Sequence, residues 1–519
     1  MNQVVVFVNG QKSTYEAEPG TRLSVFLQKQ HFVISMPCAG NHTCGKCKVK
    51  VSGALSTPTL DELRFLSEDE REMGLRLACF AKIEGDIQVF LEKREENGSI
   101  LEQTGQEQYK VNPGYSNGYG LAVDIGTTTV VVYLYCFSDG KLLAVRSGMN
   151  SQRNFGADVI SRINYCNENS LAPLQKAIIS QLNQMISDAL SFAGVTPETV
   201  KEIVIAGNTT MLHLLTGLNP YGIAVYPFTP ESLFGNELKQ GFFKSAPDAR
   251  VYLPGCISSY VGGDITCSIL ASGMMNNKTA LLLDLGTNGE MALWYHDCLY
   301  CCSTAAGPAF EGAGMQMGMT ATDGAINRVW MENDKMRYSV LGEAVPKGIC
   351  GSGIIDAVCT FIRLGLIDET GRIDEEQEVY RNYGMDFEGF PALKIGNSGV
   401  FITQQDIRKL QLAKSAISAG ISTLLHESGC LADEVEKLYL AGGFGTYIDL
   451  DSAVGIGLFP GELKEKTVSI GNGAGAGASM LLLDRDALKE EKKIMESAQE
   501  INLSSNPVFM EQYVEQMMF

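Results

Sequence analysis

The sequence has 519 residues, 45% hydrophobic and 19% charged, which is the composition of a globular protein large enough for two or three domains. Its formal net charge of −19 argues against nucleic acid or an anionic membrane as a partner, because both attract basic surfaces. We expect a cytoplasmic protein, since no stretch approaches the roughly 18 consecutive apolar residues of a membrane-spanning helix and the first residues lack the basic start and cleavage site of a secretory signal.

The first 95 residues predict a small domain with a mixed sheet packed on one helix. An apolar segment ends in an Asn-Gly pair, which is typical of a hairpin turn, and a return strand follows it. An unbroken segment with helical spacing comes next, and two further strand segments complete the pattern. The predicted strands are residues 4–8, 13–17, 48–51 and 87–91, and the predicted helix is residues 23–29.

Four of the fourteen cysteines form a pattern in this domain, and in a cytoplasmic protein we expect them to be metal ligands and not disulfides. Cys38, Cys44 and Cys47 lie on one loop and Cys79 follows later, with the spacing Cys-x5-Cys-x2-Cys-x31-Cys. Zinc also accepts four thiolates, but zinc knuckles usually pair two Cys-x2-Cys motifs, which this spacing lacks. The pattern resembles the ferredoxin family with a [2Fe-2S] cluster, in a branch whose first gap has five residues where the plant type has four. We expect His42, inside the loop, to be exposed and not to be a ligand.

A polar, glycine-containing linker over residues 96–118 leads into a segment that occurs twice. In each copy an apolar strand ends in Asp-x-Gly-Thr, and a second strand follows directly. The two aspartates, Asp124 and Asp284, stand 160 positions apart. Self-similarity at this spacing predicts two related α/β lobes that face a cleft, over residues 119–280 and 281–519.

The repeated turn suits the binding of phosphate and of a metal ion. Glycine lets the backbone approach a phosphate, and successive N–H groups and threonine hydroxyls can hold its oxygens. Asp124 and Asp284, at the strand ends, are candidates to hold Mg²⁺ through water or to position water; the alternative is an aspartate that only caps its own turn. The candidate phosphate contacts are Gly126, Thr127, Thr128, Gly286, Thr287, Asn288 and Gly289.

Two further glycine turns are candidates for contacts with the rest of a nucleotide. The strand Lys437–Ala441 runs into Ala-Gly-Gly-Phe-Gly, a turn flat enough for an adenosine to lie against. Another turn, Cys-Gly-Ser-Gly, opens a helical stretch whose first N–H groups can face the nucleotide. The candidate residues are Gly442, Gly443 and Gly445 in the first turn and Gly351 and Ser352 in the second.

A few polar residues admit both a functional and a structural interpretation. Asp264 and Glu290 are candidates to orient an attacking water, although an acidic residue beside a glycine turn is often structural. Cys301 and Cys302 are adjacent, so on a strand they point to opposite faces, which favours buried thiols over a second cluster shared across a dimer. We expect His213 to be a packed helix residue and not a metal ligand.

The repeated motifs resemble the superfamily of actin, chaperone ATPases and acetate and sugar kinases across about residues 119–487. Between the motifs, helical spacing at 173–193 and a capping box at Thr403–Asp406 predict long helices. The resemblance implies ATP binding; the alternative is a member of the fold that no longer binds nucleotide. The predicted fold class is therefore α/β, with an N-terminal β-grasp ferredoxin-like domain followed by a duplicated, two-lobed actin-like ATPase fold.

A ferredoxin domain followed by this kind of ATPase resembles the reductive activators of corrinoid-dependent methyltransferases. The resemblance implies a protein that reduces the inactive Co(II) corrinoid of a partner protein to Co(I), with ATP, Mg²⁺ and a [2Fe-2S] cluster as cofactors and a low-potential electron donor as a second partner. It leaves a homodimer open. Some members of that family carry a further small domain after the ferredoxin, for which the linker here is too short. Further stretches that carry the resemblance are 150–162, 207–211, 254–255 and 260–264.

Three other functions fit parts of the pattern. An ATP-driven electron donor to another metalloenzyme, such as a dehydratase, would use the same two domains. A small-molecule kinase with a fused redox sensor would phosphorylate a sugar or an acid. A redox-responsive binding module would have no catalytic activity. The sequence alone does not name the partner, because an interface has no short motif here.

Overall fold

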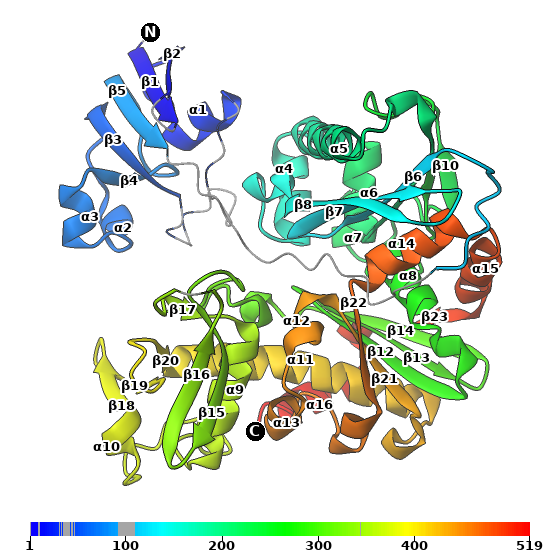
Figure 1. Cartoon of the computed structure of the whole chain (residues 1–519). Helices are drawn as coiled ribbons and strands as arrows, with labels where there is room; N and C mark the ends of the chain where they lie inside the picture. The colour runs from blue at the N-terminus through cyan, green and yellow to red at the C-terminus, as the bar shows by residue number, and fades with distance from the viewer. Residues whose placement is uncertain are drawn as a thin grey trace. The chain divides into compact units, whose positions relative to one another are not determined.

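The structure is a computed structural model, and it describes residues 2–8, 11–30, 32, 34, 42, 45, 47–91, 109–342 and 344–519. Cys38 and Cys44, two of the predicted cluster ligands, lie outside these residues. The described chain divides into two compact units, which are drawn in Figure 1. The first unit holds the N-terminal strands through residue 91 with Met149–Gln181 and His213–Pro227, and the second holds the segment that ends at Gly148 with Leu182–Leu212 and Phe228–Phe519.

The N-terminal part of the first unit is a five-stranded mixed sheet in the order β2-β1-β5-β3-β4. The predicted hairpin and helix are confirmed, and β1 also pairs in parallel with β5, which places the end of this region beside its beginning. Alternating apolar side chains of β1 and β5, among them Val4, Val6 and Val89, pack with Leu23 and Leu27 of α1 in one core. The elements are β1 (Asn2–Val8), β2 (Gln11–Ala17), α1 (Leu23–Lys29), β3 (Lys48–Leu55), α2 (Leu60–Leu63), α3 (Glu68–Glu72), β4 (Leu75–Leu77) and β5 (Ile83–Leu91).

The rest of the first unit buries polar side chains as well as apolar ones. Asn150, Gln152 and Arg162 are fully buried, and Gln152 Nε2 donates to the carbonyl of Leu174 at 3.1 Å. Asp158 caps the first turn of α4 by accepting from the Ser161 N–H at 2.7 Å. The helices here and at the edge of the second unit are α4 (Val159–Glu168), α5 (Ala172–Ala193), α6 (Thr209–Thr216) and α7 (Tyr221–Ala224).

The second unit contains two six-stranded sheets of the same design. Their orders are β10-β11-β9-β6-β7-β8 and β22-β21-β12-β13-β14-β23. In each sheet, the first two strands along the chain form an antiparallel hairpin. The first strand of this hairpin also pairs in parallel with a later strand. The strands are β6 (Tyr119–Ile125), β7 (Thr129–Cys136), β8 (Leu142–Met149), β9 (Val200–Gly207), β10 (Asn236–Leu238), β11 (Arg250–Leu253), β12 (Thr279–Leu285), β13 (Gly289–Tyr295), β14 (Cys298–Thr304), β21 (Lys437–Ala441), β22 (Thr467–Gly471) and β23 (Ala498–Glu500).

Two helices that follow equivalent strands pack against each other between the sheets. Helix α8 (Gly263–Ser272) follows β11, and α14 (Gly473–Leu483) follows β22. The sequence of α14 begins Gly-Ala-Gly-Ala-Gly-Ala-Ser, and these small residues let the helix backbones come close. A side chain at Gly477 would run into the backbone of Cys267 on α8. The contact therefore depends on glycine at this position.

The adjacent thiols of β14 lie on opposite faces of the second sheet, as predicted. Cys301 is buried in the core that the two sheets share with α8 and α14, whereas Cys302 is buried in the core on the other face. That second core also contains α9 (Gly351–Arg363) and α11 (Gln404–Ser428). His213 is likewise fully buried, in α6, as predicted.

The capping box predicted for the long helix α11 is confirmed, because Thr403 Oγ1 accepts from the Asp406 N–H at 3.2 Å and Asp406 Oδ2 accepts from the Thr403 N–H at 3.1 Å. Among the helices of the described ranges, none has both the length and the apolar character that crossing a bilayer requires. The remaining elements are β15 (Ala325–Glu332), β16 (Lys335–Val340), β17 (Gly348–Ile349), α10 (Tyr380–Tyr383), β18 (Gly384–Phe387), β19 (Phe390–Lys394), β20 (Phe401–Thr403), α12 (Gly442–Tyr447), α13 (Leu450–Gly455), α15 (Ala487–Ser497) and α16 (Pro507–Glu515).

Candidate functional site

Two of the four predicted cluster ligands lie side by side in the N-terminal domain. Cys47 directly precedes β3 and Cys79 follows β4, and the Ala78 N–H donates to the carbonyl of Cys47 at 2.9 Å. Both thiols are buried. A hydrogen bond with the Cys79 side chain lowers the pKa of the Cys47 thiol to about 7. These two residues fit a shared metal centre, since a thiolate is the form that binds iron.

The backbone before Cys79 is held by a buried ion pair that the sequence analysis did not predict. Glu62, 1% exposed, accepts from Arg76 Nε at 2.8 Å and from Arg76 Nη2 at 2.9 Å. The same carboxylate accepts from the Leu77 N–H at 2.9 Å. His42 differs from its prediction: it is half-buried, and its ring centroid lies 4.1 Å from that of Phe80.

The two predicted aspartates lie at equivalent points of the two sheets. Asp124 is near the end of β6 and Asp284 near the end of β12, and both are half-buried. Each is contacted by the helix that belongs to the other sheet. Asn472, which caps α14, donates from Nδ2 to Asp124 Oδ2 at 2.9 Å, and Ser268 of α8 donates to Asp284 Oδ2 at 3.5 Å. The crossed contacts place the two carboxylates on either side of the α8–α14 pair.

Four carboxylates of this region influence one another. Desolvation raises the pKa of Asp124 to about 7 and that of Asp284 to about 6. Desolvation and the charges of Asp284 and Asp124 raise the pKa of Asp264 to about 8. Glu290 faces Asp284 across the β12–β13 ladder, and burial with the charges of Asp264 and Asp284 raises its pKa well above the ordinary value. A cluster of like charges in a poorly solvated place favours a bound cation.

The glycine turn after β21 is brought to the same edge of the second sheet. In the ladder between β12 and β21, Ala441 is the partner of Asp284, so Gly442 follows directly beside the aspartate. Gly442 has a φ of 84°, and a Cβ there would lie 2.9 Å from Asp284 Oδ1. The turn is the first part of the short helix α12 and not a free loop, since Gly443 and Gly445 are helical.

The second predicted glycine turn also begins a helix, as expected, because Gly351 is the first residue of α9. The Ser352 hydroxyl is engaged inside the protein: Oγ donates to the carbonyl of Asn327 at 2.9 Å, and the residue is 6% exposed. Its side chain therefore fixes α9 on β15, and any role of this turn in nucleotide binding falls to the backbone N–H groups.

A glutamate that the sequence analysis missed connects the two phosphate turns. Glu311, half-buried, accepts from Thr287 Oγ1 at 2.6 Å through Oε1 and from Thr128 Oγ1 at 3.3 Å through Oε2. Asn208, at the start of α6, likewise donates to Thr127 Oγ1 at 3.0 Å. Predicted turn residues from both sheets are thus in one hydrogen-bonded region.

Asn208 had a detectable signal in the sequence. Its Gly-Asn-Thr-Thr follows the strand that pairs with β6, just as the Ala-Gly-Gly turn follows the strand that pairs with β12. Ser268, Glu311 and Asn472 gave no signal of this kind, because their contacts join segments that are far apart in the chain.

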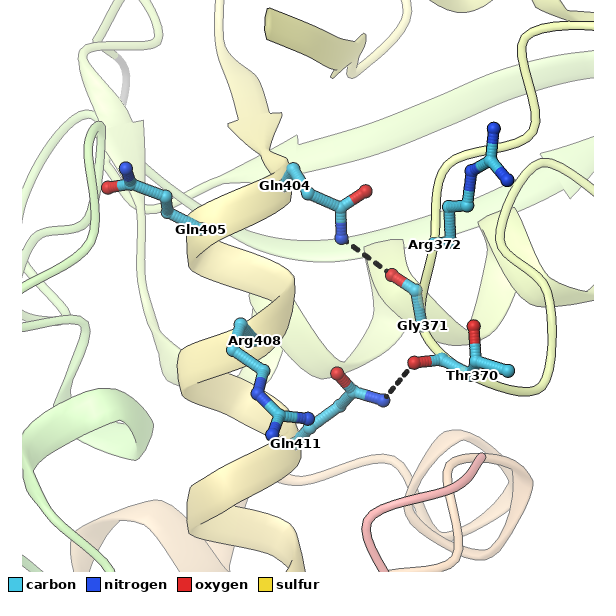
Figure 2. A pocket seen from close by; sticks show the side chains of 7 residues that line it. All are labelled: Thr370, Gly371, Arg372, Gln404, Gln405, Arg408 and Gln411. Carbon is cyan, nitrogen blue, oxygen red and sulfur yellow. Dashed lines mark hydrogen bonds between the residues drawn. The ribbon is translucent and has the colours of Figure 1, made fainter.

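A hollow of about 280 Å³ lies elsewhere, between α11 and a neighbouring loop, as Figure 2 shows. There Gln404 Nε2 donates to the carbonyl of Gly371 at 2.7 Å and Gln411 Nε2 to that of Thr370 at 2.9 Å. The glutamines fix the loop on the helix. None of the predicted nucleotide residues lines this hollow, so it is not the predicted site.

Comparison with known proteins gives matches to all three parts of the chain. Residues 6–84 match the family described as 2Fe-2S iron-sulfur cluster binding domain, residues 119–277 match the RACo middle region, and residues 278–519 match the C-terminal domain of RACo, the ASKHA domain. The 2Fe-2S match supports the cluster that the four cysteines predict.

Two relatives and one solved structure extend over most of the chain. The corrinoid activation enzyme RamQ of Eubacterium limosum is 38% identical over 428 residues, which are 77% of this chain and 70% of that protein. A Co(II) methylated amine-specific corrinoid protein reductase of Methanosarcina barkeri is 26% identical over 438 residues, 76% of each chain. The structure of a reductive activator for corrinoid, iron-sulfur protein has 30% identity and a TM-score of 0.70, and covers 100% of this chain and 98% of that one.

These matches confirm the fold prediction of a β-grasp ferredoxin domain followed by an actin-like fold. They also confirm the resemblance that was drawn from the cysteine spacing and the repeated Asp-x-Gly-Thr turn. The chain belongs to the family of RACo-type reductive activators of corrinoid proteins.

Proposed function

We propose that this chain is an ATP-dependent reductase that returns the inactive Co(II) corrinoid of a partner protein to Co(I). The observation that carries the proposal is the joining of two sites in one chain: a pair of adjacent buried thiols in a ferredoxin domain, and a carboxylate and hydroxyl site built from two equivalent sheets. The relatives named for corrinoid activation and Co(II) corrinoid reduction support it. We divide the chain into the ferredoxin domain at 1–95, the linker at 96–118 and two lobes at 119–280 and 281–519.

ATP would bind where the two sheets meet. The backbone and hydroxyls of the turns after β6 and β12 would hold its phosphates, with Gly126, Thr127, Thr128, Gly286, Thr287, Asn288 and Gly289 as contacts. The turn at Gly442, Gly443 and Gly445 would border the adenosine, and the N–H groups at Gly351 would face the nucleotide.

Mg²⁺ fits the donor set of this site, because hard carboxylate oxygens are the ligands it prefers. Asp124 and Asp284 would hold the ion through water, and Asp264 or Glu290 would orient the attacking water. Within the described ranges, no three acidic, histidine or cysteine side chains are grouped so that they could hold a metal ion directly.

Cys38, Cys44, Cys47 and Cys79 would hold the [2Fe-2S] cluster, which when bound supplies a one-electron carrier of low potential. Moving an electron to an acceptor 100 mV more negative costs about 2.3 kcal/mol. Nucleotide binding can offset such a cost only if its affinity differs between two conformations of the protein. A low-potential electron donor and a cytoplasmic location are further parts of the proposal, which leaves a homodimer open.

The test is anaerobic absorption spectroscopy of a purified Co(II) corrinoid protein mixed with this protein, a reductant and MgATP. The proposal predicts a Co(I) band that requires both ATP and the intact cysteine site. Cys79→Ser should abolish the band while ATP binding is retained. Cys136→Ser is the matched control. This half-buried thiol lies in the other unit, and its Sγ is within hydrogen-bonding distance of Ser138 Oγ.

The same experiment separates the alternatives. A Co(I) band that forms equally well without nucleotide would remove the energetic role of the ATP site. A kinase with a redox sensor would phosphorylate a small molecule, and its ATP turnover would not rise with a corrinoid protein. A dehydratase-type donor would turn over ATP with its own metalloenzyme and leave the Co(II) spectrum unchanged.

A further inference from the structure

We propose that Glu311 competes with the nucleotide for Thr128 and Thr287, so that ATP can bind fully only after this carboxylate has been displaced. The inference rests on the proposed function, because it assigns a regulatory residue to the same site. Its test is arranged so that the two can fail separately.

Glu311 is placed by a rigid element. It ends a short 3-10 turn over Pro308–Glu311 that follows β14. The residue before it, Phe310, is 2% exposed and belongs to the core beneath the second sheet. A side chain at Gly351, the first residue of α9, would run into the carbonyl of Phe310, so the turn and the helix start are in close contact. The backbone at Glu311 is therefore fixed, and displacement has to come from its side chain.

The competition follows from the number of donors. A threonine hydroxyl has one hydrogen to donate, and neither a carboxylate nor a fully ionised phosphate supplies one in return. Thr128 and Thr287 both spend that hydrogen on Glu311. A phosphate oxygen can take either hydroxyl as a donor only after the bond to the glutamate has broken. The two acceptors exclude each other at each hydroxyl.

Charge acts in the same direction. An ionised Glu311 close to the phosphate turns repels a nucleotide that carries several negative charges. In the nucleotide-free protein the two hydroxyl bonds stabilise this carboxylate against the burial that raises its pKa. A bound phosphate removes both bonds and adds repulsion, so the side chain moves away from the turns.

The two bonds differ, and this gives the order of release. The Thr287 bond of 2.6 Å has the length of a hydroxyl bond to a charged carboxylate, whereas the Thr128 bond of 3.3 Å is long. Thr287 and Glu311 both follow strands of the second sheet, and Thr128 belongs to the turn of the first. The weak bond is the one that connects the two sheets, so it breaks first and frees the first turn for phosphate.

The test measures the dissociation constant of a non-hydrolysable ATP analogue with Mg²⁺ by calorimetry, for the full chain with its cluster. Glu311→Gln keeps the side-chain shape but loses the charge and one acceptor. We expect it to bind the analogue about tenfold more tightly, equal to about 1.4 kcal/mol at 25 °C. Glu332→Gln is the matched control: it is exposed, pairs with Arg337 at 3.2 Å, and should bind like the wild type.

A double-mutant cycle separates competition from simple charge repulsion. In a chain that keeps Glu311, Thr287→Val has two opposing effects on nucleotide affinity. It removes a hydroxyl that donates to the phosphate, but the nucleotide no longer has to break the bond between that hydroxyl and Glu311. We therefore expect a small net effect. In a Glu311→Met background, where the side chain at position 311 has no oxygen to accept from Thr287, only the loss of the donor remains, and affinity should fall about tenfold. If the effects of the two substitutions on affinity are additive, charge repulsion alone explains them, and competition for the Thr287 hydroxyl is contradicted.

The outcomes are distinct. If the wild type binds no nucleotide, the proposed function fails. If the wild type binds and Glu311→Gln binds equally or more weakly with an unchanged thermal unfolding curve, Glu311 is not a competitor and the inference fails. If Glu311→Gln is unstable, Glu311→Asp, which is too short to reach both hydroxyls, gives the same comparison and should also bind more tightly than the wild type.

Discussion

The turns after β6 and β12 occupy equivalent positions in two sheets of the same strand order, yet their surroundings differ. Beside Asp124, the cross-strand partner is the apolar Val131, and the Asn472 amide occupies one carboxylate oxygen. Beside Asp284, the cross-strand partner is the acidic Glu290, and Ser268 of α8 makes a long contact of 3.5 Å with one carboxylate oxygen. An amide therefore stabilises the charged form of Asp124, whereas a second carboxyl group lies beside Asp284.

The difference shows how a duplicated scaffold can acquire two roles. The strand order and the aspartate at the strand end are common to both halves, so they reflect what any such turn needs. The side chains around each aspartate come from remote segments, and they set how strongly it attracts a cation. We therefore propose that Asp284 contributes more than Asp124 to holding the metal ion.

The largest expected effect comes from removing the two aspartates separately. Asp284→Asn should lower ATP-dependent Co(II) reduction by about 10²–10³-fold, in the range found when a positioned catalytic group is lost. Asp124→Asn should lower it only about tenfold, because an asparagine oxygen can still accept from Asn472. Initial rates of Co(I) formation at saturating ATP measure both.

The control for this pair is Asp451→Asn, which removes a carboxylate that bonds to Lys464 far from the turns in the sequence and should leave the rate unchanged. Equal losses for the two aspartates would contradict the assignment of different roles to the two turns.

A substitution in the contact between α8 and α14 tests whether this contact holds the two sheets together as one body. Gly477→Ala would push a methyl group into the backbone of Cys267, and overpacking of this kind typically costs about 1–3 kcal/mol. We expect the free energy of unfolding to fall by about 2 kcal/mol in a denaturant titration. At Gly461 a Cβ would meet only Val454 at 3.5 Å, so Gly461→Ala should be within about 0.5 kcal/mol of the wild type.

The pH dependence of Mg²⁺ binding should report the carboxylate cluster. The pKa values of Asp284, Asp124 and Asp264, about 6, 7 and 8, lie above their ordinary value, so these three carboxyls carry much less negative charge at pH 6 than at pH 8.5. Because the metal requires the ionised form, calorimetry should find affinity at least about tenfold weaker at pH 6.

The thermal stability of the metal-free protein should fall as pH rises, whereas the affinity for Mg²⁺ rises. A carboxyl whose pKa is raised by folding stabilises the protein while it is protonated, and this contribution is lost as pH rises through the folded value. Metal-free protein should therefore lose thermal stability between pH 6 and 8.5, and Mg²⁺ should restore more of it at the higher pH. Asp264→Asn should flatten the upper part of this profile. A metal effect that is independent of pH would contradict a cation site at this cluster.

The sequence predicted those parts of the molecule that depend on local pattern. The hairpin at the N-terminus, α1 and the capped helix α11 were predicted because apolar spacing and capping residues act over a few positions. The opposite burial of Cys301 and Cys302 followed from strand alternation alone. The four cysteines and the two aspartates were found because motifs repeat or keep a fixed spacing.

The remainder of the site depends on contacts between remote segments. Asn472 and Asp124 are 348 positions apart, and Glu311 is 183 positions from Thr128. No local pattern marks such a pair, because the residue on each side has an ordinary role as a helix cap or turn end. The prediction for the turn at Ser352 concerned its backbone N–H groups and stays a prediction, while the hydroxyl of this residue donates to the carbonyl of Asn327.

The smallest predicted effect compares the two contacts that cross between α8, α14 and the aspartates. Asn472→Ala removes the 2.9 Å bond to Asp124 and the 2.7 Å bond from the Gly475 N–H that caps α14, and loss of a cap costs about 1 kcal/mol. Ser268→Ala removes only a 3.5 Å contact and should cost less than about 0.5 kcal/mol. Without the amide, the pKa of Asp124 should rise further, since Asn472 lowers it in the intact protein. The Ser268 bond likewise lowers the pKa of Asp284, so carboxyl titration by isotope-edited infrared spectroscopy should show this rise at Asp124 in Asn472→Ala and a smaller rise at Asp284 in Ser268→Ala, because the Ser268 contact is longer. Similar changes in both variants would mean that the two aspartates are held alike, and that the asymmetry between the turns comes from Glu290 alone.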